Sequence, residues 1–549
     1  MLTSLELKNK HLKWLSFGVI LLFSFLPLLL KFPYRVNIYV AWEGAYRMYL
    51  GQIPFKDFGI PLGYGFWLIP FLFFKIFGPA MFTLIKAQAF INLFSLLTFR
   101  GILRLFKLKE ATVFFSVLVM CLSFTLINFW PWYNHTVFFF EIIAVYFALY
   151  YIIRKKRIYF LVLSTLFIWL ALLTKQDGGA LTFLVVFSLL IIDFFYMKQW
   201  KPLLIAIGSF IGFYLVLILP FLQYEFGYWF NYGQSPHYSR VSSYNFINDI
   251  FTQSNWIKGY FLAVVLIVLY RYNSKGFSQL WKDKSFVLFT LFTIGILIQA
   301  ALIQVTSFSP PTVNLYFHSF AFAYILFNIQ ERINFNRALV FGVVLLFVLF
   351  WKSDNYWKYS QPLFTKIAPS LFTPPPPDVV SKGNWAAKKD TVVKREPVRW
   401  VESGLKTLNR IKLPKNTVEG IKSIQELEVV KTKEENIKVL NMSNLTFLAA
   451  ELNYEPETGK DFPLWYHRGV ALFDREVDML CEKLNKAEYD LVLFEDMPNV
   501  DNFFPYEVIE CAQNKYQRVD KFLSPTGYIS DSVEVYVLKG AQDDGNINN

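Results

Sequence analysis

Charged residues are scarce in this chain of 549 residues: Asp, Glu, Lys and Arg make up 17% of it, whereas soluble domains carry about a quarter. Cysteine is rarer still, with three residues, Cys121, Cys481 and Cys511, whose spacing matches neither a zinc finger nor a disulfide framework. The shortage of charge excludes a soluble globular enzyme and a disordered chain. The shortage of cysteine excludes a disulfide-rich scaffold.

Apolar residues are abundant instead, with 55% hydrophobic residues and 60 Phe. They fall into runs long enough to cross a bilayer, which takes about 20 residues in a helix. The sequence therefore predicts a polytopic α-helical membrane protein with about eleven transmembrane helices. These spans lie near residues 14–32, 82–103, 111–131, 134–153, 158–174, 178–197, 202–222, 257–270, 285–306, 313–330 and 338–351.

Basic residues indicate the orientation of the spans. Every second connection is rich in Lys and Arg, whereas those near 131–133, 225–256 and 307–312 hold only Arg240 among them. Because basic loops stay in the cytoplasm, we predict a cytoplasmic N-terminus and, after eleven spans, an extracytoplasmic C-terminus. The net charge of +13 is then an orientation signal and implies no nucleic-acid partner.

One apolar stretch, residues 62–79, would reverse this alternation if it crossed the membrane, because it runs almost directly into the span at 82–103. We therefore interpret residues 33–80 as the first outer loop. Its aromatic residues and Pro70 are typical of helices that lie at the membrane surface.

The composition changes after residue 351. Residues 1–351 form the predicted transmembrane catalytic domain, and 352–436 a linker and charged segment with a four-proline spacer at 374–377. Residues 437–540 alternate between strand and helix patterns, which predicts a small extracytoplasmic α/β domain. The expected strands are 437–442, 489–495, 517–523 and 533–538, and the expected helices are one capped by Ser443 or Asn444, 470–486 and 505–516.

The first outer loop holds a carboxylate close to the membrane surface. Glu43 lies about one short helix after the first span, among polar and aromatic residues. A carboxylate in that position is suited to act as general base toward an acceptor hydroxyl or amine. The alternative is an interfacial carboxylate paired with Arg47, four residues further along a helix.

The order of residues in this loop resembles a known pattern. Glu43-Gly44 is followed by Gly51-Gln52-Ile53-Pro54-Phe55-Lys56-Asp57 and then by Ile76-Phe77-Gly78. This series resembles the first extracytoplasmic loop of GT-C membrane glycosyltransferases, in the bacterial branch related to protein O-mannosyltransferases and lipid A aminoarabinose transferases. The resemblance covers about residues 12–200 and weakens beyond them. It implies a polyprenyl-phosphate sugar donor, with Glu43 as the catalytic base and Asp57 in substrate binding.

The chain departs from that family in three places. The family often has two acids where this chain has only Glu43, and it favours Arg at the start of the second span, where Lys86 is the nearest cation. In the second outer loop an Asp is common, whereas Asn134 and His135 stand here and the nearest acid is Glu141. We assign Lys86, Asn134 and His135 to substrate binding, without deciding whether Asn134 or His135 replaces a second acid.

Two further cations lie on the predicted outer side. Lys175-Gln176, followed by Gly, matches a pair that recurs in the family, and a cation at this depth can hold a lipid phosphate. The alternative is that Lys175 reaches the interface or pairs with Asp177. Arg240 is the second phosphate candidate, and its alternative is a solvated loop cation. We assign Lys175, Gln176 and Arg240 to substrate binding.

Metal-ligand spacing is missing from the sequence. Asp57, His135, His237 and His318 are the residues from which a site would have to be built. We predict no cofactor and no metal site, with dependence on a divalent metal left undecided.

The predicted function is transfer of a sugar from a polyprenyl-phosphate-linked donor to a lipid, glycan or protein acceptor, with inversion at the anomeric carbon. The predicted location is the inner (plasma) membrane of a bacterium. The competing class is a transporter or lipid flippase, which often has broken helices with ionisable groups at mid-membrane. Here the polar residues gather at the outer lip, which favours the enzyme. The sugar, the acceptor, the oligomeric state and the role of the C-terminal domain do not follow from the sequence.

Overall fold

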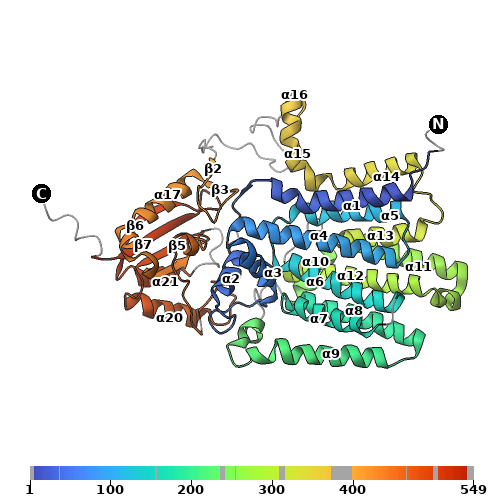
Figure 1. Ribbon diagram of the computed structural model, residues 1–549, viewed down its shortest axis with the longest axis horizontal. Helices are drawn as coiled ribbons and strands as arrows, with labels where there is room; N and C mark the ends of the chain where they lie inside the picture. The colour runs from blue at the N-terminus through green and yellow to red at the C-terminus, as the bar shows by residue number, and fades with distance from the viewer. Residues whose placement is uncertain are drawn as a thin grey trace.

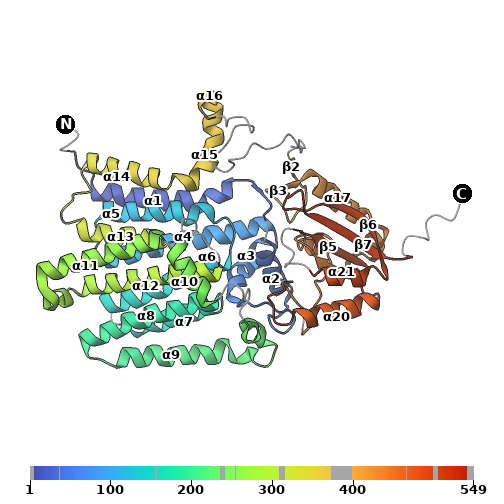
Figure 2. The same cartoon turned by 180° about the vertical axis from the view of Figure 1, so that it is seen from behind.

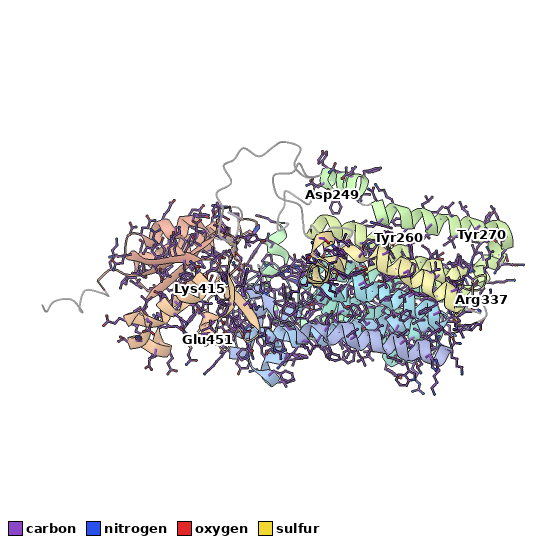
Figure 3. The ribbon with its side chains drawn as sticks, turned by 90° about the horizontal axis from the view of Figure 1, so that it is seen from above. Asp249, Tyr260, Tyr270, Arg337, Lys415 and Glu451 are labelled. Carbon is purple, nitrogen blue, oxygen red and sulfur yellow. A yellow bond between two sulfur atoms is a disulfide. The ribbon has the colours of Figure 1, made fainter. Side chains whose placement is uncertain are left out.

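A computed structural model of the chain has a bundle of long helices at one end and a smaller α/β part at the other (Figure 1, with the reverse view in Figure 2). It describes residues 5–35, 38–154, 157–234, 242–253, 255–307, 316–372, 398–460, 462–464, 466–498 and 505–540. Seen from above, Lys415 and Glu451 lie on the α/β side, and Tyr270 and Arg337 lie at the far end of the bundle (Figure 3).

The bundle consists of apolar helices, because a chain in lipid must satisfy its backbone hydrogen bonds within each segment. Its helices are α1 (Asn9–Phe25), α4 (Met81–Leu105), α5 (Glu110–Ser123), α6 (Tyr133–Ile153), α7 (Ile158–Leu172), α8 (Gln176–Met197), α9 (Lys201–Leu217), α11 (Asn255–Lys282), α12 (Lys284–Ser307), α13 (Phe317–Ile329) and α14 (Ala338–Trp351). Short elements at the edges of the bundle are η1 (Leu26–Leu29), η2 (Thr125–Ile127), η3 (Leu219–Phe221), η4 (Phe226–Gly233), α10 (Ser243–Gln253), α15 (Ser353–Ile367) and α16 (Pro369–Phe372).

Six of the described helices are long and apolar enough to cross a membrane, and a bent pair over residues 243–282 would make seven. The chain is therefore a polytopic, mostly helical membrane protein. An apolar helix lies at each of the eleven predicted spans, but α5, α7, α13 and α14 have only 13 to 15 residues. The number eleven, and the orientation that depends on it, stay predictions.

The segment predicted to be the first outer loop, residues 33–80, contains two helices, α2 (Ile38–Leu50) and α3 (Gly65–Phe77). α3 has 13 residues, as many as α13 at a predicted span, so its length does not decide whether 62–79 crosses the membrane, and the interpretation as a surface helix stays a prediction. The two helices pack closely at Gly44, where a Cβ atom would lie 2.1 Å from the Trp67 ring. This contact explains in physical terms why glycine follows Glu43.

The α/β part is built on a four-stranded sheet in the order β4-β5-β7-β6, from Val439–Met442, Leu491–Asp496, Ser532–Leu538 and Tyr516–Leu523. β4 and β5 are parallel, and the other pairs are antiparallel. One face packs against α17 (Lys415–Glu426), and the other against α20 (Phe473–Asn485) and α21 (Tyr506–Ala512) (Figure 1). A disulfide between Cys481 and Cys511 joins α20 to α21.

Residues 398–436 differ from the linker that we expected. They contain β2 (Trp400–Glu402), β3 (Ile411–Pro414), α17, α18 (Glu428–Lys433) and η5 (Glu434–Asn436). The sequence did not indicate α17, because its many Lys and Glu residues outnumber the apolar ones. Val418, Ile421 and Ile424 nevertheless form a buried apolar face on this helix. The tail of the predicted linker thus belongs to the folded α/β part.

Two predicted helices of the C-terminal part also differ. Ser443 accepts a hydrogen bond from the backbone N–H of Leu445 and so fixes a turn, whereas the next helix, α19 (Leu448–Glu451), begins further on and has Phe447 as its N-cap. The helix expected over 505–516 ends at Ala512, because the strand β6 begins at Tyr516.

A second, three-stranded sheet connects the two parts of the molecule. Its order is β1-β3-β2, and β1 (Phe32–Pro33), directly after the first membrane helix, runs parallel to β3. Tyr34 follows β1 and donates a hydrogen bond to the backbone carbonyl of Asn444 at 2.6 Å. The first outer loop is therefore held between the membrane helices and the α/β part.

Candidate active site

Glu43 lies on α2 at the junction of the two parts, and 12% of its side chain is exposed. Arg47, one turn later, donates to Glu43 from Nε at 3.0 Å and from Nη2 at 2.9 Å, and both bonds end on Oε1. Within the described part of the chain, Oε2 accepts no hydrogen bond. Arg47 thus orients the carboxylate through one oxygen, and the second oxygen remains for another partner.

The pKa of Glu43 is perturbed in the direction that suits a base. Burial raises the pKa, and the charge and hydrogen bonds of Arg47 offset only part of this rise. A carboxylate whose pKa lies above the ordinary value accepts a proton more readily, while Arg47 keeps it ionised at neutral pH more than burial alone would.

Arg47 also connects the first loop to the α/β part, and it is 2% exposed. Its Nη1 donates to Gln52 Oε1 at 3.1 Å and to the backbone carbonyl of Glu457 at 2.7 Å. The guanidinium lies 5.5 Å from the ring centre of Phe58 and 5.4 Å from that of Phe462. The residue that positions the candidate base therefore also docks the α/β part.

The Gly51–Asp57 motif forms the turn that makes this docking possible. Gly51 has φ +96°, a backbone conformation that ends α2 and that other residues rarely adopt. Gln52 Nε2 then donates to the carbonyl of Pro456 at 3.0 Å. Asp57 accepts the N–H of Ile53 at 2.7 Å through Oδ2, and its backbone carbonyl accepts the N–H of Gly459. In this structure Asp57 stabilises the loop, and its predicted role in substrate binding stays untested.

Phenol side chains from both parts interact electrostatically with Glu43. Burial, and after it the negative charge of Glu43, raises the pKa of Tyr39 from the first loop and of Tyr454 and Tyr466 from the α/β part. All three are therefore neutral hydrogen-bonding groups at physiological pH. The sequence did not indicate Tyr454 or Tyr466, because no local pattern links residues this far apart in the chain to Glu43.

Lys175 and Gln176 lie where α7 ends and α8 begins. Lys175 is 7% exposed, forms an ion pair with Asp177 at 3.0 Å and stands 5.7 Å from the ring centre of Tyr133. The pair with Asp177 is the structural alternative considered for this lysine. Gln176 Nε2 donates to the backbone carbonyl of Trp229, so the two predicted residues are held at one end of the bundle.

Asn134 and His135 lie in the first turn of α6, next to Tyr133, so the structure brings them near Lys175. His135 is 8% exposed, and its ring meets Phe124 edge-on at 5.8 Å. Glu141, two turns deeper in α6, accepts a hydrogen bond from Gln299 Nε2 at 2.6 Å. Because neither Asn134 nor His135 has a carboxylate, the second acid that is common in the family has no equivalent at these two positions.

Lys86 is not part of this group. It projects from the α4 face that carries Phe82, and its Nζ lies 4.3 Å from the ring centre of Phe77. The neighbouring residues Leu84 and Ile85 are the ones buried in the same core cluster as Trp42. Arg240 lies outside the described residues, as does His237.

Within the described ranges no group of three or more His, Cys, Asp or Glu side chains could hold a metal ion. His318 contacts Tyr260 Oη through Nδ1 at 2.9 Å, which is the interhelical hydrogen bond expected for a histidine inside a bundle.

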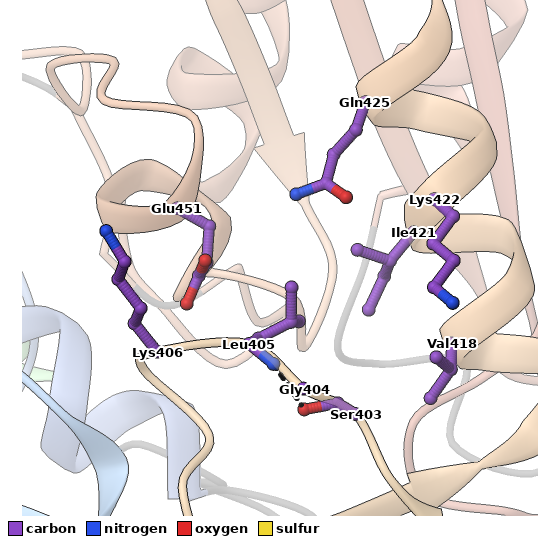
Figure 4. A pocket seen from close by; sticks show the side chains of 9 residues that line it. All are labelled: Ser403, Gly404, Leu405, Lys406, Val418, Ile421, Lys422, Gln425 and Glu451. Carbon is purple, nitrogen blue, oxygen red and sulfur yellow. Dashed lines mark hydrogen bonds between the residues drawn. The ribbon is translucent and has the colours of Figure 1, made fainter.

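A hollow of about 400 Å³ lies in the α/β part between α17 and the turn at residues 403–406 (Figure 4). Glu451 at its edge accepts hydrogen bonds from both the N–H and the hydroxyl of Thr407 at 2.6 Å. Ser403 Oγ accepts the N–H of Leu405 at 3.2 Å. These polar groups stabilise the turn after β2, and no residue of the Glu43 or Lys175 groups lines the hollow.

No protein-family model and no curated protein matches the chain. Among solved structures it is similar to the arabinofuranosyltransferase AftD from Mycobacteria, with 13% identity and a TM-score of 0.44 over 98% of this chain and 40% of AftD. It is similar to ArnT from Cupriavidus metallidurans bound to undecaprenyl phosphate, with 12% identity and a TM-score of 0.46 over 96% of this chain and 98% of ArnT. An oligosaccharyltransferase from Archaeoglobus fulgidus has 11% identity and a TM-score of 0.42 over 95% of this chain and 73% of its own.

These structural neighbours are glycosyltransferases, the class that the first-loop motif resembles. The chain spans 40% of the length of AftD. All three TM-scores lie below 0.5, so these likenesses carry no argument about the function of this chain.

Proposed function

We propose that the chain is a GT-C-like glycosyltransferase that moves a sugar from a polyprenyl-phosphate donor to an acceptor on the extracytoplasmic face of the membrane. The observation that carries the proposal is Glu43: Arg47 binds Oε1 from two nitrogens, and Oε2 is left for the acceptor. Glu43 belongs to the motif that resembles the first loop of that family.

In the proposed reaction the acceptor hydroxyl attacks the anomeric carbon of the donor sugar, and its proton passes to Glu43. The bond between that carbon and the phosphate oxygen breaks, and polyprenyl phosphate leaves with the bonding electrons. A single displacement inverts the anomeric carbon. Because the phosphate leaves as a stable anion, stabilisation of its charge by cations replaces protonation by an acid.

We assign the phosphate of the donor to the end of the bundle where Lys175 lies. Its ammonium is nearly buried beside Tyr133 and forms an ion pair with Asp177. The donor phosphate would compete with the carboxylate of Asp177 for this ammonium. Gln176, Asn134 and His135 are proposed to contact the donor there, with Arg240 as a second cation. Asp57 is proposed to act by holding the loop beside Glu43.

The proposed location of the site is the oxidising side of the membrane. The disulfide between Cys481 and Cys511 supports it, because disulfides persist outside the cytoplasm. The predicted outer position of the C-terminal part, after an odd number of spans, points to the same side.

Transfer of radiolabelled sugar from the lipid fraction of membrane vesicles to lipid, glycan or protein tests the proposal. Glu43→Gln keeps the size of the side chain and removes the base, so we expect a loss of about 100- to 10,000-fold in rate. Glu455→Gln is the matched control, because Glu455 is an exposed carboxylate at the same junction. Activity of Glu43→Gln within a fewfold of wild type rules out the assignment, and solute movement without a new glycosidic bond indicates a transporter.

A further inference from the structure

A second site lies on the outside of the bundle, next to the α/β part. It is a groove of about 410 Å³ between the end of α1, the end of α3 and the beginning of α4. Its walls are mainly aromatic and include Phe25, Phe73, Phe77 and Phe90. At its polar end two cations, Lys86 and Arg410, come from different parts of the chain.

The groove faces the bilayer, as the spacing and exposure of its aromatic residues indicate. Phe82, Lys86 and Phe90 recur every four residues and therefore share one helix face. Phe25 and Phe77 across the groove are 41% and 51% exposed. Large aromatic side chains at such exposure indicate contact with lipid in a membrane protein.

The two cations converge on one ring. Lys86 Nζ lies 5.8 Å and Arg410 Cζ 5.0 Å from the ring centre of Phe82. Arg410 also donates a hydrogen bond from Nη1 to the carbonyl of Leu28. Among the described residues neither cation forms an ion pair with a carboxylate. Two like charges held together in this way are favourable when an anion lies between them.

The depth of the site fits a phospholipid head group. Lys86 lies five residues after Met81, where α4 begins, so it sits about 7 Å along the helix axis. A basic side chain one to two turns inside a membrane helix reaches the lipid phosphates at the interface.

We propose that this groove binds an acidic phospholipid of the leaflet that faces the α/β part. Its phosphate lies between Lys86 and Arg410, and one acyl chain runs along the phenylalanines. The occupant is proposed to be a bilayer lipid rather than the sugar donor, because exposed rings on the outside of the bundle line the groove and none of its lining residues belongs to the Glu43 or Lys175 groups. Arg410 immediately precedes β3, the strand that pairs with β1, so the bound lipid fastens the α/β part to the membrane surface.

Binding of dioleoylphosphatidylglycerol and dioleoylphosphatidylcholine to the purified full-length protein, measured by native mass spectrometry, tests this inference. We expect one tightly held phosphatidylglycerol and weaker phosphatidylcholine. Removal of either cation, in Lys86→Gln or Arg410→Gln, is expected to weaken phosphatidylglycerol binding about fivefold, because a basic residue at an anionic surface contributes about that factor. Lys75→Gln is the control, because Lys75 is a cation on α3 that lies over the rings of Tyr49 and Phe71 and does not line the groove.

Equal binding of the two phospholipids, or unchanged phosphatidylglycerol binding in both single variants, would overturn the site. Lys86→Gln replaces a partly exposed side chain, so the protein is expected to fold, and a wild-type thermal midpoint confirms this. Competition with undecaprenyl phosphate shows whether the phosphate in the groove belongs to a bilayer phospholipid or to the sugar-donor lipid. If it displaces phosphatidylglycerol at lower concentration and depends on Lys86, the groove belongs to the donor and the assignment to a bilayer lipid is wrong. Because lipid binding is read without sugar transfer, an inactive enzyme does not affect this result.

Discussion

Replacement of Arg47 by methionine is expected to destabilise the protein much more than the same change at an exposed ion pair. Methionine keeps much of the apolar volume against Phe58 and Phe462 and removes the charge. Glu43 then stays buried without its cation, and the carbonyl of Glu457 loses its donor. The variant separates the electrostatic role of Arg47 from its packing.

The magnitude follows from the burial of the pair. The side chains of Arg47 and Glu43 are 3% and 12% exposed, and the loss of one partner from a buried ion pair costs about 3–5 kcal/mol. The exposed pair Lys415–Glu419 has the same i,i+4 spacing with 53% and 58% exposure. Lys415→Met is therefore a matched control, with an expected loss below about 1 kcal/mol.

Thermal unfolding of purified variants in one detergent, followed by tryptophan fluorescence, measures the ranking of the midpoints. Glu43→Gln combined with Arg47→Met removes both charges, so its loss is expected to be smaller than the sum of the two single losses. Arg47 lowers the pKa of Glu43, so its removal raises that pKa further. A raised carboxyl pKa means that the stability is retained at low pH and lost as the pH rises. The Arg47→Met defect should thus be larger at pH 8 than at pH 5.

An Arg47→Met midpoint equal to that of Lys415→Met would refute the reasoning. Full additivity of the two single variants would refute the claim that Arg47 and Glu43 act as a pair. A defect that does not change between pH 5 and pH 8 would show that lost packing, and not the uncompensated charge of Glu43, dominates the loss.

Three other predictions concern single groups. Burial raises the pKa of Glu495 to about 7, against about 4.3 in an unfolded chain. The stability that Glu495 contributes is therefore complete below the unfolded pKa, and about 3 kcal/mol of it is lost as the pH rises to 7. Glu495→Gln should flatten the dependence of the thermal unfolding midpoint on pH, and an unchanged slope would contradict this. Reduction of the Cys481–Cys511 disulfide, which closes a separation of 30 residues, is expected to cost about 3–4 kcal/mol, and equal midpoints with and without dithiothreitol would show that it does not stabilise the fold. Lys175→Gln is expected to raise the KM for the donor at least about tenfold, the range for a hydrogen bond to a charged group, with the acceptor KM unchanged; an unaltered donor titration would remove Lys175 from the phosphate site.

The membrane helices follow from the sequence because their pattern is local. Each apolar run must close its own hydrogen bonds in lipid, and an apolar helix lies at every position where such a run occurs. The pairing of Glu43 with Arg47 is local in the same way, since it needs only helical spacing. The residues around them on the other side of the site come from the α/β part, about 410 positions away, and no periodicity records such a contact.

The sequence also understated how much of the chain is folded. A high content of Lys and Glu over 378–436 indicates a solvated segment, yet α17 buries Val418, Ile421 and Ile424 against the sheet. Three apolar residues at helical spacing are a weaker signal than the surrounding charge. The pairing of β3 with β1 has no sequence signal at all, because each strand is only two to four residues long.

The parallel pairing of β1 with β3 has a consequence for the order of assembly. Phe32 leaves the ribosome with the first membrane helix, but its partner Ile411 is made 379 residues later. Contacts of such long sequence separation form late and slowly. The first outer loop must therefore wait, inserted but unpaired, until nearly three quarters of the chain has been synthesised. The surroundings of Glu43 are completed later still, because Glu457, whose carbonyl binds Arg47, follows Ile411 in the chain, so a nascent or truncated chain holds its candidate base without the groups that the α/β part supplies.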